Sequence, residues 1–188
     1  LSAHKVGGPI GVGALVVARS ARLDPLLHGG GQQRGLRSGT QDIAGAAAFA
    51  VAAELAVGEL AEESARLSGM RDRLIAGALA TIPAAELLGD PVDRLPGNAH
   101  ILFPGASGES LLFLLDMAGV SVSTGSACQA GVPEPSHVVT AMGRSDREAR
   151  EVLRFTLGRS TTDADIDAVL RVLPDAVERA RAASGSHT

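Results

Sequence analysis

The chain has 188 residues, 45% of them hydrophobic, and a formal net charge of −4. This length and apolar content allow one buried core, or one domain with an appendage. The negative charge, the absence of a Lys/Arg cluster and the lack of Trp and Tyr argue against direct nucleic-acid binding. A single cysteine excludes an intrachain disulfide, and no apolar run reaches the roughly 20 residues that span a bilayer. We therefore expect a globular protein of the reducing cytoplasm, with no membrane association.

Lys5 lies in a glycine-rich opening, LSAHKVGGPIGVGALVV, ahead of an apolar run. The glycines break any helix, and the run from Val12 to Ala18 has the length and valine content of a buried strand. Lys5 is therefore predicted in a turn that leads into this strand. A solvated lysine is the ordinary interpretation. Schiff-base chemistry is the alternative, because glycines let a flat ligand approach closely and Ser2 and His4 could donate hydrogen bonds to an anion.

The polar loop from His28 to Thr40, HGGGQQRGLRSGT, contains three consecutive glycines. A flexible surface loop is one interpretation. The other is an anion-binding loop, in which backbone N–H groups with Ser38 or Thr40 supply the donors for a phosphate. The glycines alone do not decide between them.

Several later stretches have clear secondary-structure signals. Ser38 with Gln41 fits a capping box before an alanine-rich helix over 43–60, and a stripe of apolar residues predicts a second helix that Pro83 ends. Short strands are expected over 86–89 and 100–103, with His100 a strand residue that has a local partner. A helix over 111–117 ends at Gly119, and a further short strand over 120–123 follows. Ser136 can cap a short helix that ends at Gly143, and Ser145 with Glu148 fits a capping box before a strand over 152–157. Thr162 caps the last helix.

Cys128, the single cysteine, lies in the stretch VSVSTGSACQAGVPEPS from Val120 to Ser136. These small residues favour a loop, where a thiolate could be reached, whereas a structural cysteine is usually a small buried hydrophobe. A zinc site is less favoured, because His137 is the single nearby candidate ligand. We expect no metal site.

Arg154 lies within the apolar stretch VLRFTL, where alternation places it on the face opposite Leu153 and Phe155. An arginine on such a strand is a candidate for binding a carboxylate through its planar fork. A buried structural ion pair is the alternative.

Taken together, several stretches resemble the class V aminotransferase-like cysteine desulfurases of the NifS and IscS type (group I). The matching stretches, in the same order as in the family, are SAHKVGGPIGVGAL, HGGGQQRGLRSGT, STGSAC followed by EPSHVVTAMG, and VLRFTLGRSTTDADID. The resemblance implies an α/β fold, in which the end of the large domain of a PLP-dependent transferase (fold type I) is followed by a small α+β C-terminal domain. We expect residues 1–40 in the large domain, 41–80 as connecting helices, 81–182 as the small domain and 183–188 as a disordered tail.

The resemblance also implies roles for single residues. Lys5 would bind pyridoxal 5′-phosphate covalently, and Ser2 and His4 would contact its phosphate. Thr40 resembles the residue that reaches the phosphate in the partner subunit of a homodimer. Arg154 would bind the substrate carboxylate, and Cys128 would accept the sulfur.

The function implied is conversion of L-cysteine to L-alanine, with sulfur transferred to Cys128 as a persulfide. The sulfur would then pass to an acceptor protein, either an iron–sulfur scaffold or a tRNA-thiolation enzyme. Alternatives are a selenocysteine lyase or another class V aminotransferase, neither of which needs Cys128, and a noncatalytic small domain that binds sulfur-transfer partners. Because the chain resembles the C-terminal half of such enzymes, we expect it to be inactive alone.

Overall fold

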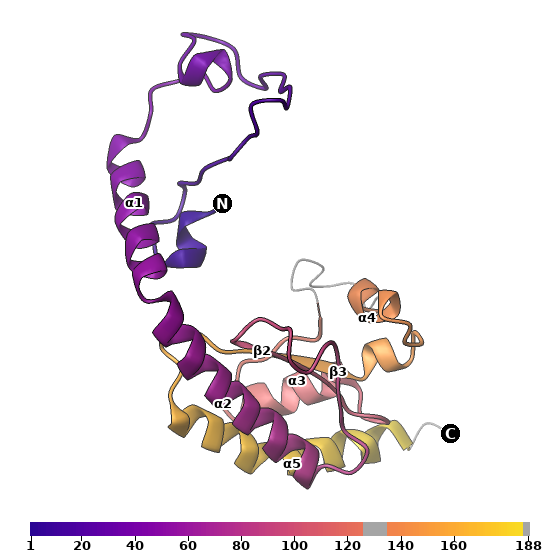
Figure 1. Cartoon of the computed structure of the whole chain (residues 1–188). Coiled ribbons are helices and arrows are strands. Elements are labelled where there is room, and N and C mark those ends of the chain that lie inside the picture. The colour runs from indigo at the N-terminus through magenta and orange to yellow at the C-terminus, as the bar shows by residue number, and fades with distance from the viewer. Residues whose placement is uncertain (126–134, 186–188) are drawn as a thin grey trace. The chain divides into compact units, whose positions relative to one another are not determined.

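The computed structural model describes residues 1–125 and 135–185, which form two compact units, Leu1–Ala61 (unit 1) and Glu62–Thr188 (unit 2) (Figure 1). The division falls inside the region expected as connecting helices, so the first of those helices groups with residues 1–40. Each unit is described by itself.

Unit 1 contains the short 3-10 helices η1 (Ala3–Val6) and η2 (Gln33–Gly35) and the helix α1 (Ile43–Gly58), which packs against η1. The predicted helix is confirmed, but its cap is not the predicted one. Asp42 is the N-cap, and its Oδ1 accepts a hydrogen bond from the Gly45 N–H at 2.9 Å. The Gln41 side chain instead donates to the Gly39 carbonyl, so it does not form a capping box with Ser38.

The predicted strand over 12–18 is wrong. The backbone there makes one antiparallel bridge, between Ser2 and Gly13, and Leu15 and Val16 are 77% and 82% exposed. A strand forms only where a neighbouring strand pairs with its backbone, and residues 1–61, all of which are described, supply one bridge. Apolar composition indicates that a segment would be stabilised by burial, but it does not provide a neighbouring strand with which the backbone can pair.

Unit 2 is built on an antiparallel sheet, which within the described residues has the order β1-β2-β3. Its elements are α2 (Leu60–Thr81), β1 (Glu86–Leu87), β2 (Asn98–Leu102), α3 (Gly108–Met117), α4 (His137–Ala141), η4 (Glu148–Arg150), β3 (Val152–Thr156) and α5 (Asp163–Gly185). The helices and strands predicted in this region are thus confirmed, apart from the strand over 120–123. That segment makes a single bridge, between Ser123 and Arg154. Because α5 continues to Gly185, residues 183–185 are helical and do not belong to a disordered tail.

The two faces of the sheet have different environments. On one face Ile101 and Leu153 are fully buried in the main core, together with residues of α2, α3 and α5. On the other face Leu102 and Val152 form a smaller apolar cluster with Val139 of α4 and with residues Leu88 and Ala149. Figure 1 shows α2 and α5 on one side of the sheet and α4 on the other. The alternation of strand side chains therefore accounts for both clusters.

In unit 2 the predicted Ser145–Glu148 capping box and the predicted cap at Thr162 are both confirmed. The Glu148 N–H donates to Ser145 Oγ, and Glu148 Oε2 accepts from the Ser145 N–H at 2.9 Å. Thr162 and Asp165 make the same reciprocal pair at the start of α5. Both follow from the spacing Ser/Thr-x-x-acid, which is a local signal.

Within the described residues, no single helix is long and apolar enough to cross a membrane. The helices α1 and α2 meet that test only as a bent pair, by length and composition.

Candidate functional site

Ser2, His4 and Lys5 lie on one tight turn at the start of unit 1. Ser2 is the N-cap of η1, Lys5 N–H donates to the Ser2 carbonyl at 3.1 Å, and Gly7 ends the turn with φ +84°. All three side chains are exposed, and the Ser2 hydroxyl makes no capping hydrogen bond. The turn therefore presents a hydroxyl, an imidazole and an amine together, which confirms the predicted turn around Lys5.

Two glycines allow the backbone to close around this turn. A Cβ atom at Gly13 would lie 2.5 Å from the Leu1 carbonyl oxygen, and one at Gly8 would lie 2.9 Å from the Ala3 Cβ. Such distances exclude any larger residue without a backbone shift, so glycine is required at both positions. The folded-back chain is held by hydrogen bonds from Ala3 N–H to the Val12 carbonyl and from the N-terminal amine to the Ala14 carbonyl.

The loop from His28 to Thr40 is held by its own side chains. Gln32 Oε1 accepts from the Gly39 N–H at 3.0 Å, and the Arg37 guanidinium donates to the Ser38 carbonyl at 2.8 Å. Ser38 is 6% exposed, whereas Thr40 is exposed. Of the two hydroxyl residues considered for anion binding, Thr40 is the one that a ligand can reach.

Arg154 lies at the centre of β3 in unit 2. Its backbone N–H and C=O both pair with Ser123, at 2.7 and 3.2 Å. Its guanidinium has one weak hydrogen bond, from Nη2 to Ser123 Oγ at 3.5 Å, and Nε is buried without a partner. In the part of the chain that is described, no carboxylate pairs with Arg154, so the structural ion pair considered as an alternative is absent there.

His100 lies directly opposite Arg154 in the sheet, and the sequence alone does not indicate that it belongs to the candidate site. It lies on a strand as predicted, but its Nε2 is buried and has no hydrogen-bond partner among the described residues, so the predicted local partner is not found there. Burial, with Arg154 and Arg94 nearby, lowers the pKa of His100 to about 4. The imidazole is therefore neutral at physiological pH. Its position opposite Arg154 depends on strand register, which the sequence alone does not fix.

Cys128 lies outside the described residues. The residues on either side of the undescribed segment 126–134 are close together, because a Cβ atom at Gly125 would lie 3.1 Å from the Ser136 Cβ. Ser136 is the N-cap of α4, but its hydroxyl makes no capping hydrogen bond. Ser136 therefore occupies the predicted capping position, but its side chain does not cap the helix.

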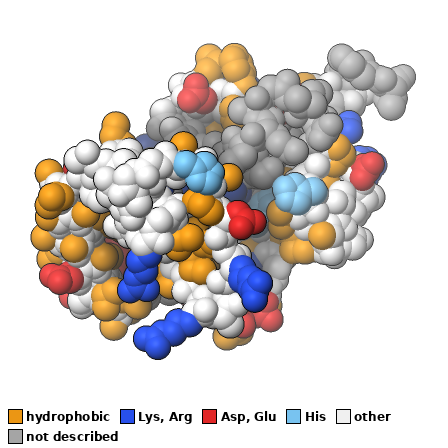
Figure 2. Space-filling model, turned by 90° about the horizontal axis from the view of Figure 1, so that it is seen from above, with side chains coloured by type: hydrophobic (Ala, Val, Ile, Leu, Met, Phe, Trp, Pro, Cys, Tyr) orange, Lys and Arg blue, Asp and Glu red, His pale blue; other side chains and the backbone are white. Residues whose placement is uncertain are grey.

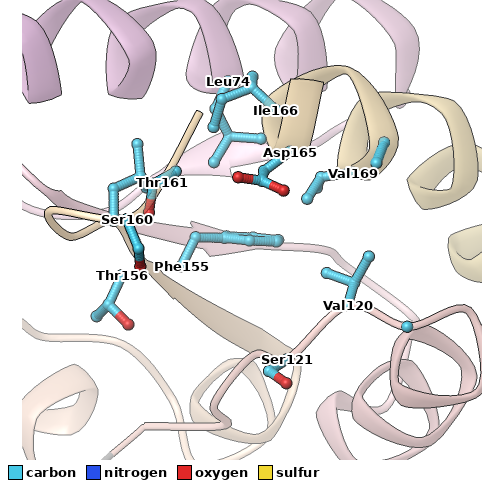
Figure 3. Close-up of a pocket in the computed structure, with 13 residues that line it drawn as sticks. Leu74, Val120, Ser121, Phe155, Thr156, Ser160, Thr161, Asp165, Ile166 and Val169 are labelled. Atoms are coloured by element: carbon cyan, nitrogen blue, oxygen red, sulfur yellow. The ribbon is translucent and has the colours of Figure 1, made fainter. Parts of the chain in front are cut away.

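A cavity of about 240 Å³ lies elsewhere in unit 2, beside β3 and the start of α5 (Figure 3). Phe155, Asp165 and Ser121 are among the residues that line it. The Asp165 carboxylate accepts from both the N–H and the hydroxyl of Thr162, which lowers its pKa. None of the residues predicted to bind cofactor or substrate lines this cavity, and its carboxylate serves as a helix cap.

Comparison with known proteins identifies the family. The model of the family Aminotransferase class-V matches residues 1–169. The chain belongs to this family. It is 54% identical over 186 residues to a Mycobacterium tuberculosis protein named IscS-like cysteine desulfurase, covering 98% of this chain and 47% of that protein. Among class V relatives with solved structures, a NifS-like protein aligns with a TM-score of 0.81 at 34% identity, covering 95% of this chain and 45% of the other.

A second solved structure that resembles this chain has cysteine bound. A solved structure described as SspA in complex with cysteine aligns with a TM-score of 0.55 at 31% identity, covering 83% of this chain and 42% of that protein. The chain thus spans about half the length of the relatives it matches. These alignments confirm the predicted α/β fold of PLP-dependent, fold type I proteins.

Proposed function

We propose that this class V chain contributes to a cysteine desulfurase, which converts L-cysteine to L-alanine and passes the sulfur on as a persulfide. The main support is its 54% identity, over 98% of its length, to a protein named as an IscS-like cysteine desulfurase. Among the described residues the Arg154 guanidinium pairs with no carboxylate, which gives this proposal a chemical basis.

The donors on the Ser2–Lys5 turn fit pyridoxal phosphate, which members of this family use. An exposed hydroxyl and an exposed imidazole can donate to a phosphate, and the Lys5 amine can attach to the cofactor aldehyde. Lys5 is also the single lysine of the chain. When bound, the cofactor supplies an electron sink for the substrate's Cα. Thr40 is proposed to reach the phosphate bound to the second subunit of a homodimer.

Arg154 is proposed to bind the carboxylate of L-cysteine. A planar guanidinium can donate two parallel hydrogen bonds to a carboxylate, and this one has no competing acid among the described residues. The related SspA has cysteine bound, which is consistent with an amino-acid substrate of this size.

Cys128 is proposed to be the sulfur acceptor. Its thiolate would attack the sulfur of L-cysteine, forming an S–S bond while the substrate C–S bond breaks and its electron pair stays with the substrate carbon. Protonation of that carbon gives alanine, and the persulfide on Cys128 can be handed to an acceptor protein. The proposed acceptors are an iron–sulfur scaffold or a tRNA-thiolation enzyme, in the cytoplasm.

Unit 1 gives a reason why activity should depend on additional protein. The helix α1 is apolar on all sides, yet Val51 and Val57 are 56% and 73% exposed. Hydrophobic side chains also occupy many parts of the surface seen in Figure 2. Such helices are normally covered by other protein. We propose that the rest of the fold found in the relatives covers unit 1 and completes the cofactor site.

The deciding experiment is to incubate the cofactor-loaded protein with L-cysteine and to analyse Cys128 by mass spectrometry. A gain of one sulfur atom on the Cys128 peptide, together with formation of alanine, is expected. Cys128→Ser is the matched control and should retain cofactor while losing persulfide and sulfur transfer. Alanine formation that does not require Cys128, or faster turnover of selenocysteine than of cysteine, would favour a selenocysteine lyase or another class V enzyme.

A further inference from the structure

The face of the sheet that carries Arg154 changes character along its length. Three cross-strand pairs share this face: Leu102 with Val152, His100 with Arg154, and Asn98 with Thr156. The first pair is fully buried, the second is half-buried, and Thr156 is exposed. The His100–Arg154 pair thus lies at the boundary between an apolar cluster and solvent.

His100 and Arg154 form the closer of the two kinds of antiparallel pair. The N–H and C=O of Arg154 both bond to Ser123, on the side of β3 away from β2. The His100 carbonyl accepts from the Leu88 N–H, on the side of β2 away from β3. This is a non-hydrogen-bonded pair, in which the Cα atoms lie about 4.5 Å apart and the side chains are adjacent.

Each of these adjacent side chains has a buried nitrogen without a partner. Arg154 Nε can only donate, because a guanidinium has no acceptor, whereas a neutral imidazole has one acceptor nitrogen. A buried polar atom without a partner is unfavourable, because it has lost its hydrogen bonds to water. One hydrogen bond between these two atoms would satisfy both.

The charges around His100 favour the neutral, accepting form. The charged groups that act on it are the guanidinium groups of Arg154, on β3, and Arg94, in the loop before β2. No carboxylate among the described residues is identified as acting on it, so nothing nearby stabilises an imidazolium. Arg94 donates from Nε to the Asp90 carbonyl and from Nη2 to the Leu88 carbonyl, but its Nη1 is also buried without a partner among the described residues. This nitrogen competes with Arg154 Nε for the imidazole, and the direct cross-strand pairing of His100 favours Arg154.

We propose that His100 is a positioning residue for Arg154: its Nε2 accepts a hydrogen bond from Arg154 Nε–H and so fixes the direction of the guanidinium fork. Each terminal nitrogen of Arg154 then keeps at least one N–H for a carboxylate, because Nη2 uses only one of its two for Ser123 Oγ. Ser123 does not do this alone, because its hydroxyl reaches Nη2 at only 3.5 Å. The inference rests on the proposed function for the identity of the carboxylate, that of L-cysteine, but the His100–Arg154 contact can be tested without it.

The contact is tested by nuclear magnetic resonance on the 188-residue chain. Arg154 Nε–H should exchange slowly with water in the wild type and in His100→Gln, whose amide oxygen can accept. It should exchange at least about tenfold faster in His100→Leu, which has no acceptor. Equal exchange rates in wild type and His100→Leu would overturn the proposal. If the leucine variant does not fold, a scalar coupling across the hydrogen bond from Arg154 Nε to His100 Nε2 decides the matter in the wild type, and its absence overturns the proposal.

The consequence for binding is tested with the cofactor-loaded enzyme. His100→Leu should raise KM for L-cysteine about tenfold with little change in kcat, while His100→Gln should stay within about twofold of wild type. If His100 only supports the fold, both substitutions should instead lower kcat and the stability of the protein. If the loaded wild type, supplied with the rest of the fold found in the relatives, does not turn over L-cysteine, the proposed function fails. The resonance experiment still decides whether His100 positions Arg154.

Discussion

Gly125 and Ser136 pack directly against each other, although the segment that contains Cys128 separates them in sequence. A Cβ atom at Gly125 would lie 3.1 Å from the Ser136 Cβ and 3.2 Å from its Oγ, and the Gly125 φ of +122° is one that side chains rarely adopt. Ser136 is 5% exposed. The described residues on either side of 126–134 therefore meet at one place in unit 2.

Gly125→Ala should destabilise the protein by about 1–3 kcal/mol, because it combines an unfavourable φ with a steric conflict. Urea unfolding monitored by circular dichroism measures this free energy. Gly143→Ala is a matched control, because its φ is +83° but no atom lies within 4 Å of the new Cβ. A loss of stability no larger than that of the control would show that contact with Ser136 does not matter.

Arg154→Ala should weaken L-cysteine binding by on the order of 2 to 5 kcal/mol, because the substrate carboxylate loses its charged partner. Cofactor loading should be unchanged, since the proposed cofactor residues lie in unit 1. The measurement is KM together with the absorbance of bound cofactor. Arg154→Lys keeps the charge but not the fork, and should recover only part of the loss. An unchanged KM in both variants would assign Arg154 a structural role.

Because of His100, the free energy of unfolding should decrease as the pH falls below 6.5, the ordinary pKa of histidine. Its folded-state pKa of about 4 is lower than the ordinary 6.5, so the unfolded state binds more protons between these values. Stability should therefore decrease from pH 6.5 towards pH 4, by at most about 1.4 kcal/mol per pH unit. Urea unfolding at pH 7 and pH 4.5 should show a smaller pH effect in His100→Gln than in wild type. An equal effect in both would mean that His100 has an ordinary pKa.

The sequence predicts best those features that depend on neighbouring residues. The apolar stripe of α2 and the Thr162–Asp165 capping box are local patterns, and both are present in the structure. The alternation in VLRFTL correctly places Leu153 in the core and Arg154 on the opposite face. Periodicity and capping chemistry determine these features within a few residues, so no distant contact is needed to predict them.

Features that depend on pairing between segments far apart in the sequence could not be predicted from local patterns. The segments 12–18 and 120–123 have strand-like composition, but each makes only one isolated bridge among the described residues, Gly13 with Ser2 and Ser123 with Arg154 of β3. His100 and Arg154 lie far apart in sequence, and only the β2–β3 register makes them neighbours. Shifting that register by one residue would place His100 opposite an apolar residue on the other face. The sequence therefore predicts Arg154 as a single site residue, but it does not predict that His100 is its neighbour.

Lys5 should be the attachment point of the cofactor. Borohydride reduction of the loaded protein should fix the cofactor on the peptide that contains Lys5, which mass spectrometry identifies. No other lysine occurs in these 188 residues, so within them Lys5 is the side-chain amine that can form the adduct. A Lys5→Arg variant keeps the positive charge but should lose the reducible adduct. Unchanged covalent attachment after the substitution would contradict the role of Lys5.

In the isolated chain, the backbone amides of unit 1 should be much less protected from hydrogen exchange than those of unit 2. In residues 1–61, all of which are described, the buried residues are Ala3, Ser38 and Gly45, whereas β2 and β3 lie in a continuous apolar core. Opening α1 therefore exposes little additional apolar surface and should require little free energy. Hydrogen–deuterium exchange should be faster for α1 amides than for β3 amides by several orders of magnitude, and pyridoxal phosphate should bind weakly. Equal protection of α1 and β3, or strong desulfurase activity of the isolated chain, would show that unit 1 needs no further protein to cover it.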